Sequence, residues 1–351
     1  MPNIREILEK AKQAGASDVH ITVGIPPKMR VNGKLVTIPD YDRMTQTDTL
    51  DVVLRIMSET QRNCFEEKGE YDMSFSLSNL GRYRVNAYKQ RGSAALAFRL
   101  VATKIPSAEE LGLPKTVVDL AAKRRGLILV TGPTGSGKST TLAALIDQIN
   151  NNRDAHVITL EDPIEYLHHH RQAIVNQREI GLDTDSYAKA LHAALREDPD
   201  VIMLGELPDL ETINIAIEAA EAGHLILSSM HTVDAACTIE RILESCPPYK
   251  QQALRIQLSE VLEGIVSQQL MPTADGQGRV AAFEVLTVNK EIRGLIREGA
   301  YGRLPSAIQT NRGQGMMLMD EAIGQLCFNG RIDKETALAY ARNPENMAVR
   351  L

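Results

Sequence analysis

The feature that most constrains this chain is a glycine-rich segment between an apolar run and a helical pattern. Residues Leu127 to Val130 are all apolar and predict a buried strand. Residues 132–139 then read Gly-Pro-Thr-Gly-Ser-Gly-Lys-Ser, which fits the pattern G-x-x-x-x-G-K-[ST]. From Leu142 to Ile149 apolar residues recur at helical spacing. This order of strand, glycine loop and helix is the setting that a phosphate-binding loop requires.

The residue types in this loop suit a nucleoside triphosphate. Glycines let backbone N–H groups converge on a phosphate, and the positive end of the following helix faces the same anion. We expect Lys138 to reach the β- and γ-phosphates and Ser139 to bind Mg²⁺. The alternative, a glycine-rich turn before an ordinary helix, is disfavoured by the correct flanks. The predicted nucleotide-binding residues are Gly132, Pro133, Thr134, Gly135, Ser136, Gly137, Lys138, Ser139 and Thr140.

Length and composition narrow the class of protein. The 351 residues suggest two domains or three, and 43% hydrophobic with 24% charged residues is typical of soluble globular proteins. The net charge of −6 gives no support for nucleic-acid binding. No apolar run approaches the ~20 residues that cross a membrane, and the N-terminus does not resemble a signal peptide, so we expect a cytoplasmic protein without an integral membrane segment. The four cysteines do not form C-x-x-C pairs, so neither a zinc ribbon nor a disulfide framework is indicated.

Patterns in the first hundred residues predict a small α+β domain at 1–102 with a mostly antiparallel sheet. Apolar spacing indicates helices, and alternation indicates strands split by a turn at Asn32-Gly33. A polar segment bounded by prolines, 103–115, is the expected interdomain linker. The expected helices are 3–15, 47–57 and 60–68; the expected strands are 17–23, 29–31, 34–38, 71–77, 82–88 and 93–100.

From 116 to 351 strands and helices alternate, which predicts an α/β domain with a central, mostly parallel sheet covered by helices. Residues 261–270 are ambiguous between a helix and a helix-to-strand element, and 279–288 predict a strand that pairs near Leu270. Helices are expected from 290 onward. The further strands expected are 156–160, 174–177, 201–204 and 225–230, with helices at 117–122, 187–195 and 210–222.

Acidic residues follow two of the predicted strands. Strand 156–160 is followed by Glu161 and, four residues later, Glu165; strand 201–204 is followed by Gly205-Glu206. Carboxylates at the carboxyl ends of parallel strands are well placed beside a phosphate loop. We expect Ser139, water and carboxylates of 161–165, Glu161 among them, to hold the metal, and Glu206 to orient the attacking water. The alternative is that these are solvated loop acids.

Histidines and arginines supply further candidates. His224 and His231 flank one predicted strand, where they would sense the γ-phosphate or bridge to a neighbouring subunit. Arg84 and Arg99 lie on neighbouring strands of the small domain, and an arginine from a separate domain can act as a finger that couples movement to hydrolysis. The alternatives are packed or surface imidazoles and a solvated strand face. The run 168–170, three histidines, predicts an exposed loop rather than a metal site.

Taken together, these motifs resemble the secretion-type ATPases of the type IV pilus and type II secretion group, and most closely the retraction branch. The resemblance covers nearly the full chain. It rests on Gly132–Thr140 (Walker A), 158–166 (the acidic box), 195–206 (Walker B) and 222–232 (the His box), together with Asp18-Val-His-Ile and Gly81-Arg-Tyr-Arg-Val-Asn-Ala.

The resemblance implies a PAS-like N-terminal domain, a RecA-like ATPase domain and a homo-hexameric ring with ATP and Mg²⁺ between the two domains. By motif, it implies that Glu165 and Glu206 are catalytic acids, that His224 and His231 approach the γ-phosphate, and that Arg84 and Arg99 are the N-terminal-domain arginines. It further implies a motor ATPase at the cytoplasmic face of the inner membrane. Such a motor acts on a pilus platform protein, removes pilin from the fibre and drives twitching motility.

Two alternatives within this group stay open. Extension and secretion ATPases usually carry an extra N-terminal domain and a four-cysteine metal site, and the expected absence of both favours the retraction branch. An accessory paralogue with weak turnover of its own, which joins another ATPase, is favoured by Pro208, where retraction enzymes typically have arginine. The segment Glu291-Ile-Arg-Gly-Leu-Ile296 also departs from the usual Ala-Ile-Arg-Asn-Leu-Ile.

Overall fold

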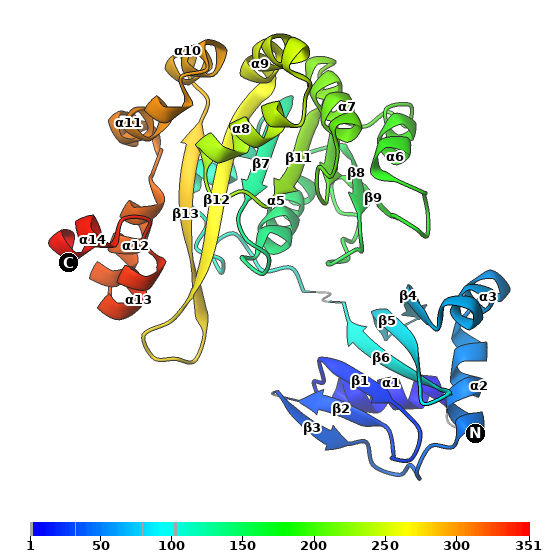
Figure 1. Ribbon diagram of the computed structural model, residues 1–351. Coiled ribbons are helices and arrows are strands. Elements are labelled where there is room, and N and C mark those ends of the chain that lie inside the picture. Colours follow the sequence, from blue (N-terminus) through cyan, green and yellow to red (C-terminus); the bar gives the residue numbers. More distant parts are fainter. Residues whose placement is uncertain (1–2, 32, 79, 102–103) are drawn as a thin grey trace. The chain divides into compact units, whose positions relative to one another are not determined.

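A computed structural model describes residues 3–31, 33–78, 80–101 and 104–351, and it confirms a mixed α/β protein. The chain divides into two compact units, Met1–Thr103 and Lys104–Leu351 (Figure 1). Asn32 of the predicted turn and residues 102–103 at the predicted linker lie outside the described residues. Among the residues described, no helix combines the length and the apolar character that crossing a bilayer demands.

The first unit contains one antiparallel sheet of six strands in the order β3-β2-β1-β6-β5-β4. Capping boxes at Thr45 and Ser58 fix the starts of its second and third helices. Its elements are α1 (Ile4–Gln13), β1 (Asp18–Ile21), β2 (Lys28–Val31), β3 (Lys34–Thr37), α2 (Gln46–Ile56), α3 (Glu59–Lys68), β4 (Glu70–Leu77), β5 (Gly81–Gln90) and β6 (Ser93–Leu100).

The helices that the structure describes in this unit pack on one face of this sheet. Val19, Val85 and Phe98 lie opposite one another in register and are buried with apolar residues of the three helices. On β5 the alternate positions, which face the other way because side chains alternate along a strand, include the polar residues Arg84 and Asn86. Arg84 and Arg99 lie on this second face.

The second unit contains a sheet of seven strands in the order β13-β12-β7-β11-β10-β8-β9, with every pair parallel except β12 with β13. Its strands are β7 (Gly126–Thr131), β8 (His156–Glu161), β9 (Ile174–Glu179), β10 (Val201–Leu204), β11 (Leu225–Met230), β12 (Leu262–Pro272) and β13 (Arg279–Thr287). Its helices up to β13 are α4 (Lys115–Leu120), α5 (Lys138–Asn152), α6 (Tyr187–Ala194), α7 (Leu210–Glu221), α8 (Ala235–Glu244) and α9 (Pro248–Val261).

Helices cover both faces of this sheet. Alternate residues of β7 enter different cores: Leu127 and Leu129 pack with α6 to α9, whereas Ile128 and Val130 pack with α4 and α5. Strands β7, β10 and β11 are therefore buried along their whole length, as expected of central parallel strands.

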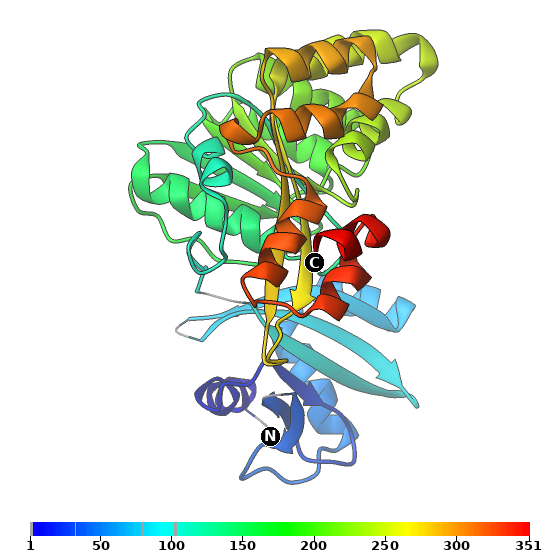
Figure 2. The same ribbon diagram turned by 90° about the vertical axis from the view of Figure 1, so that its left-hand side faces the viewer.

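The last sixty residues form two groups of helices (Figure 2). Helices α10 (Lys290–Glu298) and α11 (Leu304–Thr310) join the core made by α6 to α9. Helices α12 (Met319–Phe328), α13 (Lys334–Tyr340) and α14 (Pro344–Arg350) form a separate apolar cluster with Met271 of β12 and Ala282 of β13. We call these three helices the C-terminal cap.

The structure settles the ambiguous segments. Residues 262–272 form a strand rather than a helix, and it pairs with both β7 and β13. Residues 235–261, for which the sequence patterns above predict nothing, form α8 and α9. Asp234 begins α8 by accepting a hydrogen bond from the backbone N–H of Cys237, a standard helix N-cap.

Candidate nucleotide site

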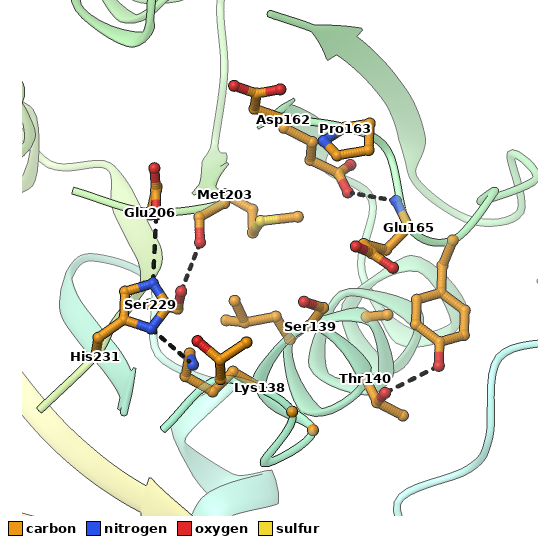
Figure 3. Close-up of a pocket in the computed structure, with 18 of the residues that line it drawn as sticks. Lys138, Ser139, Thr140, Asp162, Pro163, Glu165, Met203, Glu206, Ser229 and His231 are labelled. Atoms are coloured by element: carbon orange, nitrogen blue, oxygen red, sulfur yellow. Dashed lines mark hydrogen bonds and ion pairs between the residues drawn. The ribbon is translucent and has the colours of Figure 1, made fainter. Parts of the chain in front are cut away.

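The predicted phosphate loop borders a cavity of about 470 Å³ at the carboxyl ends of the parallel strands. Four strands end there, β7, β8, β10 and β11, and each is followed by polar residues that line the cavity (Figure 3). Among them are Lys138 and Ser139 after β7, Glu161 and Glu165 at and after β8, Glu206 after β10 and His231 after β11.

Two glycines of the loop lie close against Gln268 of β12. A Cβ on Gly132 would lie 2.3 Å from the carbonyl oxygen of Gln268, and one on Gly137 would lie 2.8 Å from the Gln268 side-chain nitrogen. Both glycines also have φ values in the left-handed region, +143° and +92°. Strand β12 therefore packs closely against the loop through Gln268. The side chain of Gln268 also accepts a hydrogen bond from Thr141 at 2.7 Å.

Lys138 is a largely buried cation that contacts two backbone carbonyls and His231. Its Nζ donates to the carbonyl oxygens of Gly132 at 2.8 Å and Pro133 at 3.1 Å, and it lies 3.4 Å from Nδ1 of His231. Burial lowers the pKa of this ammonium, and the field of Glu206 opposes the shift. Nearby, the buried Ser136 hydroxyl has no hydrogen-bond partner among the residues that the structure describes. A phosphate would supply the missing anion and acceptor, so the loop fits a nucleotide.

Sheet order explains why His231 lies beside both Lys138 and Glu206. Strand β11 lies between β7 and β10, so its carboxyl end lies between the phosphate loop and Glu206. His231 Nε2 lies 3.5 Å from a Glu206 carboxylate oxygen, and Nδ1 faces Lys138 (Figure 3). The strand end is held by Ser229, whose hydroxyl donates to the carbonyl of Gly205 at 2.6 Å. Lys138, His231 and Glu206 thus form one chain of contacts across the cavity.

Glu161 and Glu165 approach the cavity from β8. Glu161 is buried and accepts hydrogen bonds from Thr159 at 2.6 Å, from Gln177 at 3.0 Å and from the backbone N–H of Glu165 at 3.4 Å. Burial raises the pKa of its carboxyl, although these three donors oppose the shift. Glu165 is exposed and lies across the cavity from Glu206 (Figure 3).

The cavity fits Mg²⁺ only together with a phosphate ligand. In the described part of the chain, no group of three or more His, Cys, Asp or Glu side chains is arranged to hold a metal ion. Mg²⁺ is commonly bound by one or two protein oxygens, waters and substrate phosphates, and Ser139 and Glu161 offer such oxygens here. Bound there, the ion would neutralise charge on the phosphate oxygens.

Some predicted site residues do not meet the others. His224 precedes β11, so six strand residues separate it from His231. It therefore lies at the amino ends of the parallel strands, where its Nδ1 is 2.8 Å from the carbonyl oxygen of Pro199. The expectation that both histidines reach one sheet edge overlooks that a strand's two ends lie apart. Arg84 and Arg99 are directly opposite on β5 and β6, both exposed, and Arg99 forms an ion pair with Asp18 at 2.9 Å.

The sequence patterns missed several residues that line the cavity. His168, expected in an exposed loop, lines the cavity through a largely buried ring, and burial lowers its pKa to about 4; only His169 and His170 are exposed. Tyr166 shares a hydrogen bond of 2.9 Å with Thr140. A histidine run and a lone tyrosine gave no usable signal. Tyr187, Leu270 and Arg279 also line the cavity, and Leu270 and Arg279 come from the β12–β13 pair.

Comparison with known proteins identifies the family. Residues 1–327 match the family described as type II/IV secretion system protein. The chain belongs to this family. Among type II/IV secretion proteins, it is 43% identical to the type IV pilus retraction ATPase PilT of Pseudomonas aeruginosa, with 98% of this chain and 99% of that protein covered. It is also 42% identical to the type IV pilus ATPase PilU of the same organism, with 97% and 89% covered.

A solved structure of the family agrees over the whole chain. The crystal structure of the pilus retraction motor PilT with bound ADP superposes with a TM-score of 0.91 at 46% identity, covering 99% of both chains. The family resemblance predicted from the Walker, acidic-box and His-box motifs is therefore confirmed.

Proposed function

We propose that this chain is a motor ATPase that retracts type IV pili as a hexameric ring at the cytoplasmic face of the inner membrane. The observation that carries the proposal is the contact chain Lys138–His231–Glu206, in which the phosphate-loop cation, a strand-end histidine and an acid meet in one cavity. Similarity to a retraction ATPase over nearly the whole chain supports the pilus as the object of the motor.

The residues take distinct roles in ATP hydrolysis. The phosphate loop, from Gly132 to Thr140, binds the phosphates, and Lys138 exchanges its loop carbonyls for phosphate oxygens. Glu206 orients and deprotonates the attacking water, with Glu165 as a second acid on the other side. His231 positions Glu206 and faces the γ-phosphate. His224, at the other end of β11, would form a contact with a neighbouring subunit. Ser139 and Glu161 would hold Mg²⁺, which would neutralise phosphate charge.

The two units take the roles of a PAS-like domain, 1–102, and a RecA-like domain, 116–351, joined by the linker 103–115. One strand, β11, separates the phosphate-loop strand from the strand that precedes Glu206, which supports a RecA-like core. Arg84 and Arg99 lie on the sheet face opposite the one on which the described helices of their unit pack, and we assign them to charge stabilisation at the nucleotide. In a ring, pulling on a membrane platform protein would convert hydrolysis into pilin removal and twitching motility.

A second candidate is an accessory ATPase that works in a ring with a paralogue. Pro208 favours it, because retraction enzymes typically have arginine there, and identity to PilU is nearly equal to identity to PilT. Pro208 lines a cavity of about 650 Å³ beside Glu206 and His231, and Arg241 of α8 lines the same cavity. Arg241 therefore places a positive charge in this second cavity, to which Pro208 contributes no charge.

Complementation of a strain that lacks its retraction ATPase tests the proposal. The native chain is expected to restore retraction of fluorescently labelled pili, whereas Glu206→Gln, expressed at the same level, is expected not to. Restoration only when a second retraction ATPase is present, or only by Pro208→Arg, would instead establish the accessory role. Failure of both variants and the native chain, with rings formed, would contradict both readings.

A further inference from the structure

The segment that carries His231 is short and is tied down at its far end. Asp234 follows only three residues later, so its Cα lies within about 11 Å of that of His231. Asp234 is buried and caps α8, accepting from the N–H of Cys237 at 2.6 Å. The Thr232 hydroxyl of this segment shares a hydrogen bond of 2.6 Å with the hydroxyl of Thr238 in α8. The segment that follows His231 is therefore fixed to α8 at both Thr232 and Asp234.

The partner of Asp234 comes from the C-terminal cap. Arg342, in the turn between α13 and α14, forms an ion pair with the Asp234 carboxylate across 108 residues of sequence. Its own backbone is fixed, because the N–H groups of Arg342 and Asn343 donate to the two carboxylate oxygens of Asp320 at 2.7 and 3.1 Å. The backbone of Arg342 is thus held by α12, and its guanidinium contacts Asp234 at the end of the His231 segment.

A second buried acid completes this contact. Glu284 of β13 accepts a hydrogen bond from the N–H of Ala235 at 3.0 Å, and the Arg342 charge acts on it. Burial opposes ionisation of Asp234, but the Cys237 N–H and Arg342 outweigh it and lower the pKa of that carboxyl. Burial raises the pKa of Glu284. Without Arg342, Asp234 would keep its hydrogen bonds from Cys237 but lose its ion pair with the C-terminal cap, and the buried Glu284 nearby would lose the Arg342 charge.

We propose that Arg342 is a positioning residue for ATP hydrolysis: through its ion pair with Asp234, the C-terminal cap holds His231 between Lys138 and Glu206. This inference rests on the proposed ATPase function and adds a mechanical connection that lies outside the nucleotide cavity. The cap packs on the β12–β13 pair, whose strand β12 also shapes the phosphate loop through Gln268. Movement of the cap therefore changes the catalytic geometry from two sides.

A cycle of variants separates positioning from general stability. Steady-state hydrolysis of Mg·ATP by the full-length protein is measured for the native chain, Arg342→Met, Arg342→Lys, His231→Ala and the double variant Arg342→Met/His231→Ala. Arg350→Met, which removes an exposed arginine from α14 of the same cap, is the matched control. Ring formation and affinity for a fluorescent ATP analogue are measured in parallel.

We expect Arg342→Met to lower kcat by about ten- to a hundred-fold with KM and nucleotide affinity changed less than about three-fold. We expect Arg342→Lys to recover part of the loss and Arg350→Met to have no effect. Because Arg342 acts through His231, the double variant should be no slower than His231→Ala alone. If Arg342→Met does not form rings, Arg342→Lys enters the cycle in its place and is interpreted in the same way.

Three results would overturn the inference. They are a kcat for Arg342→Met within two-fold of native, losses that multiply in the double variant, and equal loss in Arg350→Met. These results leave the ATPase function intact, since the native chain still hydrolyses ATP. Absence of turnover by the native chain itself would instead overturn the proposed function, and this inference with it.

Discussion

The two sheets of this chain differ in how many of their faces are covered. In the second unit, helices lie on both faces, and strands β7, β10 and β11 are buried from end to end. In the first unit, all three helices contribute to one core, and the opposite face carries Arg84, Arg99 and Asp18. A sheet covered on both sides has room for reactive groups only where its strands end.

This difference explains where the functional candidates lie. The phosphate loop, Glu161, Glu206 and His231 all follow carboxyl ends of parallel strands, and their neighbourhood follows from the strand order. The first unit instead offers side chains from the middle of its strands, because every second residue faces away from the core. The nucleotide cavity is thus built from residues at strand ends, whereas the two arginines lie on an exposed sheet face.

The largest expected effect is on stability. Ile128→Ala in β7 removes a fully buried side chain and should lower the free energy of unfolding by about 2–5 kcal/mol. Leu35→Ala in β3, where the side chain is 48% exposed, should change it by less than about 0.5 kcal/mol. Urea unfolding followed by circular dichroism measures both. Equal losses in the two variants would contradict the difference in burial between the sheets.

The next-largest effect concerns the pH dependence of stability due to His168, which lines the nucleotide cavity. Burial lowers the pKa of His168 from 6.5 to about 4, so the unfolded chain binds a proton at higher pH than the folded one. The stability due to the neutral ring is complete above pH 6.5 and is lost as pH falls to 4, by about 3 kcal/mol in total. His168→Gln should lack this loss, and His169→Gln, at an exposed neighbour, should keep it. Urea midpoints at pH 7, 5.5 and 4 measure the difference; identical profiles for all three proteins would refute the buried state of His168.

The smallest effect tests the open face. Arg84→Ala should leave the free energy of unfolding within about 0.5 kcal/mol of native, because the side chain is exposed. If the arginine stabilises charge at the nucleotide, kcat should nevertheless fall by about ten-fold or more. Lys34→Ala, another exposed cation on a strand of this sheet, is the control. A variant that hydrolyses ATP like the control would show the arginine to be a solvated surface residue.

How much of this was predictable depends on whether the signal is local. The strand, loop and helix around Lys138 could be predicted, since each is encoded by adjacent residues. The ambiguity at 261–270 arises because a strand buried on both faces has no alternation. His168 was placed wrongly because burial of a loop residue depends on what packs over it.

Pairings between distant segments were beyond the sequence. The strand order that puts His231 between Lys138 and Glu206 depends on how β7, β10 and β11 pair. The contact of Arg342 with Asp234 joins residues 108 apart, and neither residue stands in a motif.

The measurement that most directly tests the central claim is ATP turnover by Glu206→Gln beside nucleotide binding by the same protein. This account predicts that the variant forms rings and binds the fluorescent ATP analogue within about two-fold of native, because Lys138 and the phosphate loop are unchanged. It predicts that kcat falls by about a hundred-fold or more, because the amide cannot take a proton from water. Turnover within a few-fold of native would contradict the claim that hydrolysis is carried out by the strand-end groups of the parallel sheet.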